Sequence, residues 1–396
     1  MALFRVSAWL VVSAAAICGG ASSEYQARRG ALRKAFPEGV IVLNGGVEST
    51  KDVEEVRSPF FQEPNFYYLT GWTQPGARLL IDAHREILFL PPHDAEREKW
   101  AGPRPAAGDP GIEQSSGFDR VVPLERFEIE LRGSPAPAEN GAVEQALGRL
   151  RMQKSPAEIA LIERCIEATA AAHKAAWKRA AAGVYEYQVA ALMVSVYLDR
   201  GCERSAYAPI VGSGPNAVYL HYDRNTRRIE HGELLLMDVG AECAGYAADV
   251  TRTIPVDGHF SKRQRELYDI VLGAQKAAIA AVKPGMTIGR NTPNSIYQVA
   301  FEYLNSHGKD LHGAPLGKYF THGISHHIGL EVHDAADVTA PLAEGMVISV
   351  EPGLYIPEEQ MGIRIEDMVL VTRDGARLLT APLPREAAEI EKAMAR

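Results

Sequence analysis

Four acidic residues interrupt apolar, strand-like runs in the C-terminal half of this chain of 396 residues. They lie in the runs LLLMDVGAECAGYAADVTRT, MVISVEPGLY and GIRIEDMVL, at Asp238, Asp249, Glu351 and Glu366. An ionised carboxylate in an apolar strand is costly unless a cation or strong hydrogen-bond donors stabilise its charge. Asp238 alone could face water at a strand end, but four interruptions indicate one shared polar centre that draws distant strands together.

A histidine-rich segment, THGISHHIGLEVHD, lies between these acids and contains His322, His326, His327 and His333. Core packing does not require this density, so imidazole ligands are the natural alternative. Four carboxylates would balance two divalent cations, with one neutral imidazole completing the set. Oxygen-rich ligation of this kind favours Mn²⁺, Co²⁺ or Fe²⁺ over a thiolate-bound structural zinc. Two such ions ~3.5 to 4 Å apart deprotonate water and polarise a carbonyl, which indicates a hydrolase.

The composition is that of a globular protein. Hydrophobic residues make up 46% and charged residues 23%, which excludes extensive disorder. The net charge of -8 counts against nucleic acid as a partner, because phosphate binding requires clustered cations.

The N-terminus has the pattern of a secretory signal. Arg5 precedes an apolar stretch from Ser7 to Cys18, and small residues follow it. The stretch is much shorter than the ~20 residues that span a bilayer, so a permanent membrane anchor is the lesser alternative. We expect residues 1–23 to be removed and the mature chain to be periplasmic or secreted, with no attachment to a membrane. Because Ile17 occupies a position where a lipobox needs a small residue, we do not expect a lipid on Cys18.

Cleavage of this segment leaves an odd number of cysteines: Cys165, Cys202 and Cys243. No disulfide framework can be derived from so few, and we expect all three as small buried side chains.

Two domains are expected after the signal. Residues 24–150 contain short apolar runs, among them GVIVLNGG, NFYYLTGW and ARLLIDAHREILFLPP, which predict strands, and helical stretches at 95–101 and 142–151. They predict an α/β domain. The second domain, 151–396, opens with a long helix, since Ser155, Pro156 and Glu158 form a capping box. Similarity between 173–184 and 275–286 suggests an internal duplication of helices followed by strands.

The ordered motifs MDVGAECAGYAADVTRT, HGISHHIGLEVHD, SVEPGLY and IRIED resemble those of the pita-bread metallopeptidases, most of all bacterial aminopeptidase P and the related prolidases. NFYYLTGWTQPGARLLI resembles the N-terminal domain of those two groups. The resemblance implies an α/β N-terminal domain of aminopeptidase-P type and a pita-bread catalytic domain, a duplicated helix-plus-antiparallel-sheet fold. It also implies two divalent ions per subunit, Mn²⁺ first, with Co²⁺, Fe²⁺ or Zn²⁺ as alternatives, and a homo-oligomer, either dimer or tetramer.

The resemblance assigns roles to individual residues. The implied metal ligands are Asp238, Asp249, His326, Glu351 and Glu366. Asp249 and Glu366 would bridge the ions, Asp238 would also receive the substrate's free amine, and Glu351 would be the general base. The residues implied to contact the peptide or assist proton transfer are His221, His322, His333 and Arg364.

Alternatives stay open for several of these residues. His333 could be structural, and Arg364 an exposed residue at a strand edge. His327 is not expected to be catalytic. Trp100 resembles a tryptophan that reaches a neighbouring subunit's site in some relatives, although packing is the commoner use of a single Trp.

The activity implied by the resemblance is hydrolysis of the N-terminal Xaa-Pro bond of peptides with proline in second position. The proline nitrogen carries no hydrogen, so a pocket for the ring and a proton donor near that nitrogen are needed. A prolidase, limited to Xaa-Pro dipeptides, is the closest alternative. A non-catalytic relative that binds peptides is disfavoured, because no ligand position is lost.

Overall fold

The computed structural model describes residues 15–48 and 60–395, and the chain divides into two compact units, Met1–Leu147 and Gly148–Arg396. The signal segment expected over residues 1–23 lies mostly outside the described residues, because only its end, from Ala15, belongs to a described helix. Within the described ranges, no helix has both the length and the apolar character needed to cross a membrane.

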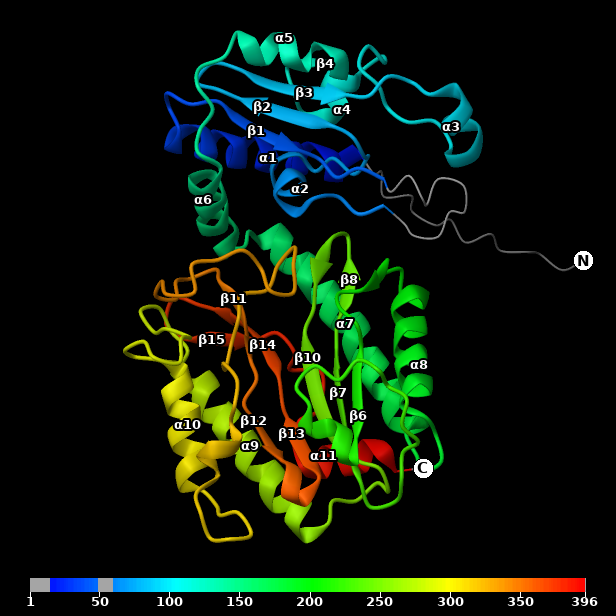
Figure 1. Cartoon of the computed structure of the whole chain (residues 1–396), viewed down its shortest axis with the longest axis vertical. Helices are drawn as coiled ribbons and strands as arrows, with labels where there is room; N and C mark the ends of the chain where they lie inside the picture. Colours follow the sequence, from blue (N-terminus) through cyan, green and yellow to red (C-terminus); the bar gives the residue numbers. More distant parts are fainter. Residues whose placement is uncertain (1–14, 49–59, 396) are drawn as a thin grey trace, which may run out of the picture. The chain divides into compact units, whose positions relative to one another are not determined.

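The N-terminal unit is built around one sheet. Its strands, in spatial order, are β1 (Ile41–Asn44), β2 (Arg78–Ile81), β3 (Glu86–Leu90) and β4 (Val121–Pro123), and only β3 and β4 pair in parallel. Its helices are α1 (Ala15–Ala35), α2 (Pro64–Thr70), α3 (Ala95–Ala101), α4 (Ile112–Ser116), α5 (Phe127–Arg132) and α6 (Asn140–Met152), whose end crosses into the second unit. Figure 1 shows α1 on one side of the sheet and α5 on the other. Phe127 packs on Leu80, Ile87 and Phe89, which forms an apolar core between α5 and the strands. The expected α/β class is confirmed.

One segment of this unit differs from the sequence prediction. The strand predicted for NFYYLTGW is wrong, because this segment forms most of helix α2. Glu63 caps the helix by accepting hydrogen bonds from the backbone amides of Asn65 and Phe66. Pro64 lies in the first turn, where its missing N–H costs nothing. An apolar run of this length does not distinguish a buried strand from a buried helix by periodicity.

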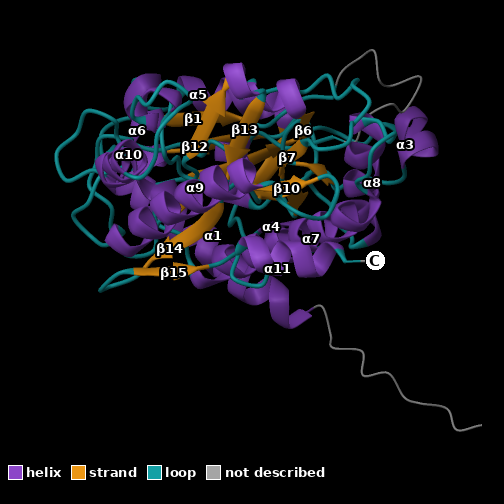
Figure 2. Cartoon of the chain, turned by 90° about the horizontal axis from the view of Figure 1, so that it is seen from below, coloured by secondary structure: helices purple, strands orange, loops and turns teal. Residues whose placement is uncertain are grey.

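The C-terminal unit contains one arrangement twice, two helices followed by antiparallel strands. The first set is α7 (Pro156–Arg179), α8 (Glu186–Asp199), β5 (Arg204–Ser205), β6 (Ile210–Ser213), β7 (Leu234–Val239), β8 (Ala241–Cys243), β9 (Tyr246–Ala247) and β10 (Val250–Pro255). The second set is α9 (Lys262–Ala281), α10 (Ile296–Ser306), β11 (Val347–Val350), β12 (Gly353–Ile356), β13 (Met361–Arg364), β14 (Asp367–Val371) and β15 (Ala376–Leu378), followed by α11 (Ala387–Met394). Figures 1 and 2 show the strands in the middle of the unit with helices around them. The expected duplicated helix-plus-antiparallel-sheet fold is confirmed.

The long helix α7 begins at the predicted capping box. The Ser155 side chain accepts a hydrogen bond from the Glu158 amide, and the Glu158 carboxylate accepts one from the Ser155 amide. These contacts satisfy two backbone groups that a helix start leaves unpaired. The helix then buries Ile162 and Ile166, which lie four residues apart and therefore on one face.

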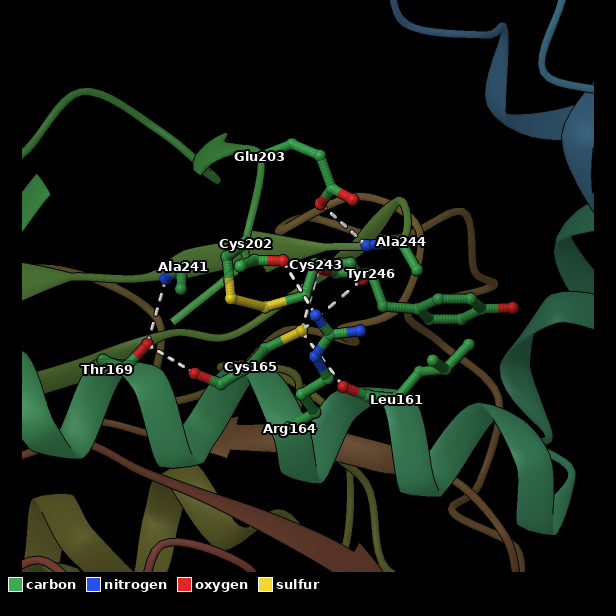
Figure 3. The surroundings of a disulfide bond; sticks show 11 residues. Leu161, Arg164, Cys165, Thr169, Cys202, Glu203, Ala241, Cys243, Ala244 and Tyr246 are labelled. Carbon is green, nitrogen blue, oxygen red and sulfur yellow. Dashed lines mark hydrogen bonds between the residues drawn. A yellow bond between two sulfur atoms is a disulfide. The ribbon is translucent and has the colours of Figure 1, made fainter. Parts of the chain in front are cut away.

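Cys165, Cys202 and Cys243 are all buried, as expected, but two of them are paired. Cys202 and Cys243 form a disulfide across 41 residues of sequence, and only Cys165 is a free, buried side chain among the described cysteines. Strand β5 pairs with β8, with Arg204 opposite Glu242, and this pairing brings the two sulfur atoms together (Figure 3). The disulfide was not predicted, because nothing in the spacing of three cysteines indicates that so short a strand meets β8.

Candidate metal centre

The four predicted acidic ligands lie at the ends of two antiparallel strand pairs. In the pair formed by β7 and β10, Asp238 is the penultimate residue of β7 and Asp249 immediately precedes β10. In the pair formed by β11 and β14, Glu351 immediately follows β11 and Glu366 immediately precedes β14. Each half of the duplicated fold therefore presents two acids where its central strand pair ends.

His326 lies among these acids. Its Nε2 atom is 3.4 Å from Oδ2 of Asp249, 3.3 Å from Oε1 of Glu351 and 4.0 Å from Oε1 of Glu366. The backbone of His326 is hydrogen-bonded to Ser349 of β11, which holds the ring beside that strand. Ligand atoms of Asp249, His326 and Glu366 all lie within 4.8 Å of one another, a spacing that suits donors around a metal ion.

Asp238 joins this group through Tyr207, a residue that was not among the predicted site residues. The Tyr207 hydroxyl lies 2.6 Å from Oδ1 of Asp238 and is also within hydrogen-bonding distance of Asp249. A hydroxyl has one proton, so Tyr207 can donate to only one of these two carboxylates at a time, and in the metal-free site the other bonds to it only when it carries a proton itself. No periodic or motif signal marks Tyr207 in SAYAPI, which is why sequence alone did not identify it.

The electrostatics of the acids fit a cation. Burial raises the pKa of Asp249 well above its usual value, and the nearby charges of Asp238 and Glu351 raise it further. Burial likewise raises the pKa of Glu366, with Asp249 adding to the shift, and raises that of Glu351. Oε1 of Glu366 is buried and, in the described part of the chain, has no hydrogen-bond partner. Divalent cations would supply the positive charge and the missing partner, so this donor set suits the metal site predicted from the sequence.

Arg364 lowers the pKa of Asp238, whereas the pKa values of the other three acids are raised. Burial by itself would raise the pKa of Asp238, but Arg364 beside it holds that pKa below its usual value. The guanidinium donates hydrogen bonds to Oδ2 of Asp238 at 2.5 Å and to the Tyr355 hydroxyl at 2.6 Å. Arg364 is only 3% exposed, so the alternative of an exposed strand-edge residue is wrong.

The predicted peptide-contacting histidines surround two adjoining cavities. One cavity of about 200 Å³ and another of about 230 Å³ both include His221, Asp238, His326, His333 and Glu351 in their walls. His322 lines the first cavity and lies 2.8 Å from the Tyr355 hydroxyl through Nε2. The rings of His333 and His326 meet edge to face, with centroids 4.3 Å apart.

Burial lowers the pKa of two of these imidazoles, those of His322 and His333. Burial, with a contribution from Arg364, lowers the pKa of His322 to about 3, so this ring is neutral near pH 7. Burial and the neighbouring His326 also lower the pKa of His333. Neutral rings can donate a hydrogen bond through one nitrogen and accept through the other.

Neither His327 nor Trp100 is among the residues that line these cavities. His327 is buried and is bridged through its backbone to Ile348, and it is not part of either cavity wall. Trp100, in α3 of the N-terminal unit, is 88% exposed.

Both units match known families. Residues 25–140 match the N-terminal domain of aminopeptidase P, and residues 160–373 match metallopeptidase family M24. The Xaa-Pro aminopeptidases of Escherichia coli (strain K12) and Haemophilus influenzae are each 32% identical to this chain; the alignments cover 94% and 90% of it and 97% and 94% of those proteins. The Xaa-Pro dipeptidase of Pyrococcus furiosus is 33% identical over 83% of this chain and 94% of its own length.

Solved structures agree with these sequence matches. Aminopeptidase P from E. coli with the inhibitor Pro-Leu superposes with a TM-score of 0.83 and 29% identity, over 94% of this chain and 98% of that one. Proline aminopeptidase P II from Yersinia pestis gives a TM-score of 0.81 and 29% identity, over 94% and 99%. The resemblance drawn from the sequence motifs is confirmed, and the chain belongs to metallopeptidase family M24, with an N-terminal domain of the aminopeptidase P type.

Proposed function

We propose that this chain is a metal-dependent exopeptidase that removes the N-terminal residue from peptides with proline in second position. The observation that carries the proposal is the convergence of three buried acids, the partly buried Glu351 and His326 beside cavities lined by further histidines. The Xaa-Pro aminopeptidases among its relatives match over nearly their whole length, which supports this substrate class over others.

Asp238, Asp249, His326, Glu351 and Glu366 would hold two divalent ions. When bound, such ions supply a reactive water at neutral pH and polarise the scissile carbonyl. We propose Mn²⁺ as the ion, because four carboxylates and one imidazole form an oxygen-rich set, with Co²⁺, Fe²⁺ and Zn²⁺ as alternatives. Reconstituting the metal-free protein with each ion, and measuring bound metal and hydrolysis together, tests this choice. Fewer than one bound ion per subunit and no hydrolysis would favour a non-catalytic peptide-binding protein.

The chain's own residues would bind the substrate and transfer the protons. Glu351 accepts the proton of the attacking water, and Asp238, kept ionised by Arg364, receives the positively charged amine of the substrate. The proline nitrogen must gain a proton as it leaves, and His221 and His333 line the cavities from which such a proton can come. The neutral His322 donates through Nδ1 to the Gly323 carbonyl and accepts through Nε2 from the Tyr355 hydroxyl, so it would shape the wall of the substrate cavity and would not donate to the scissile carbonyl.

A dipeptidase limited to Xaa-Pro substrates is the second candidate, favoured by the match to the Pyrococcus furiosus Xaa-Pro dipeptidase. The two activities differ in whether the proline carboxylate must be free. Comparing Gly-Pro with a longer Gly-Pro-Xaa peptide, each with the reconstituted enzyme, separates them. Cleavage of the dipeptide alone would overturn the aminopeptidase proposal.

We propose that the enzyme is exported and that residues 1–23 are removed in that process. The Cys202–Cys243 disulfide supports this location, because disulfides persist in oxidising compartments and are rare in the cytosol. Fractionation of the native cells, with N-terminal sequencing of the mature chain, tests the proposal. An unprocessed chain found in the cytosol would contradict it.

We also propose a homo-oligomer, a dimer or a tetramer. Trp100 is 88% exposed, and a large, exposed aromatic side chain is typical of the residues that a subunit contact buries. The molar mass from light scattering, compared between the wild type and Trp100→Ala, tests it. A monomeric wild type at micromolar concentration would contradict the proposal.

A further inference from the structure

Glu186 is a buried acid around which the segment between β6 and β7 folds. It lies in the first turn of α8 and its side chain is completely buried. Among the described residues its carboxylate accepts hydrogen bonds from Ser213 N and Oγ, Asn216 Nδ2, the Tyr222 hydroxyl and Arg227 N, at 2.8 to 3.2 Å. The Arg227 guanidinium binds Glu233 instead, so the carboxylate is satisfied by neutral donors drawn from one segment of chain.

This segment carries His221. Asn216 lies five residues before His221 and Tyr222 directly follows it, so Glu186 holds the chain on both sides of the histidine. Between them, the carbonyl of Leu220 accepts a hydrogen bond from Nη2 of Arg364, at 3.3 Å. The His221 ring is exposed and lines both cavities of the metal centre. Its position is therefore set by the backbone to which it is attached.

The start of α8 and this segment are also joined through the backbone. The Glu186 amide donates to the carbonyl of Arg227 at 3.0 Å, and the Tyr187 amide donates to that of Asn225 at 2.8 Å. Asn225 adopts a left-handed conformation (φ 50°), and its side chain accepts a hydrogen bond from the Val211 amide. The segment thus has one defined path, with the Glu186 carboxylate at its centre and favoured there by the N-terminus of the helix.

We propose that Glu186 is a positioning residue that sets the place of His221 against the peptide substrate, an inference that rests on the proposed function. A buried carboxylate with five donors defines one geometry, because any displacement of the segment leaves a buried donor or acceptor unpaired. Displacing a proton-transferring ring by about 1 Å is enough to slow a reaction on the order of a hundredfold.

Glu186→Gln tests this proposal, because it keeps the shape of the side chain and turns an amide group toward the donors. The chain offers a matched control in Glu158→Gln. Glu158 is also buried in the first turn of a helix, and it also accepts hydrogen bonds from a backbone amide and a tyrosine hydroxyl. We expect Glu186→Gln to lower kcat/KM by roughly tenfold to a hundredfold with bound metal unchanged, and Glu158→Gln to stay within about twofold of the wild type.

A double-mutant cycle with His221→Ala separates positioning from general damage. If Glu186 acts through His221, adding Glu186→Gln to His221→Ala should lower kcat/KM by less than about twofold further. The same fold-loss in both backgrounds would overturn the proposal. So would an equal loss in Glu158→Gln.

Hydrogen exchange provides a readout that does not depend on activity. Peptides covering 213–229 should exchange faster in Glu186→Gln than in the wild type or in Glu158→Gln, and unchanged exchange would overturn the proposal. A wild type that does not hydrolyse Xaa-Pro peptides would overturn the proposed function, while exchange still tests whether Glu186 holds this segment. Should Glu186→Gln fail to fold, Tyr222→Phe removes one donor only. Like Glu186→Gln, it should speed exchange in 213–229 and lower kcat/KM. No change in either measurement would overturn the inference.

Discussion

Reduction of the Cys202–Cys243 disulfide should cost the C-terminal unit about 4 kcal/mol of unfolding free energy. The bond joins residues 41 apart in sequence. Closing a loop of that length removes about 13 cal/mol/K of entropy from the unfolded chain, or about 4 kcal/mol at 25 °C. Reduction leaves both sulfur atoms in place, so the packing of the folded state changes little and the loss reports mainly the connection itself.

This loss should be visible as a lower melting temperature. For a unit of this size, 1 kcal/mol corresponds to about 2 to 4 °C, so reduction should lower Tm by roughly 8 to 16 °C. Thermal unfolding followed by circular dichroism, with and without a dithiol reductant, measures the shift at one pH and one metal concentration. The variant Cys202→Ala with Cys243→Ala should melt near the reduced wild type and should not respond to the reductant.

Cys165 provides the matched control. Burial raises the pKa of its thiol to about 12, so near pH 7 it lacks the thiolate that attacks a disulfide. Cys165→Ala should therefore keep the full response to reductant. A Tm shift below about 3 °C on reduction would refute the loop-closure reasoning. Three titratable thiols instead of one, in the unreduced and denatured chain without residues 1–23, would show that the bond does not form.

Three further perturbations address the metal centre. Glu351→Gln should lower kcat on the order of a thousandfold or more, because it removes a ligand charge and the proposed base together, and near-normal turnover would show the role to be misassigned. Arg364→Lys should lower kcat/KM by about tenfold, since an ammonium does not span Asp238 and Tyr355 as the guanidinium does, and unchanged kinetics would contradict this. In the metal-free chain, burial raises the pKa of Asp249 and Glu366, so their contribution to stability is complete below about pH 4 and is lost as the pH rises toward the raised values. Chelation should therefore lower Tm more at about pH 8 than at about pH 5, and an equal shift at both would argue against these pKa directions.

The acids of the site were predictable because they break a strong pattern. A carboxylate within an apolar strand conflicts with its surroundings, and such conflicts mark functional sites. The structure brings Asp249, Glu351 and Glu366 within 3.3 to 4.0 Å of His326, as that argument requires. Tyr207 gave no comparable signal, since a tyrosine in a short, irregular segment is compatible with packing, exposure or ligation.

The disulfide and helix α2 show a second limit. Cys202 meets Cys243 only because the two-residue strand β5 pairs with β8, and a pairing that short leaves no pattern in the sequence. NFYYLTGW contains β-favouring aromatic residues, yet Glu63 and Pro64 begin a helix there. In both cases a few specific contacts, the pairing of β5 with β8 and the capping of α2 by Glu63, determine a structure that composition alone does not indicate.

The duplication explains why two acids from each half reach one centre. Helices and strands recur in the same order, and in each half one acid lies at the end of a strand while the next immediately precedes its antiparallel partner. The Thr251 hydroxyl of the first half donates to the carboxylate of Glu366 from the second, at 2.7 Å, and the Glu366 amide donates to the Thr251 carbonyl. The halves are therefore fastened to each other at the site itself, so a change that separates them should release metal before it unfolds either sheet.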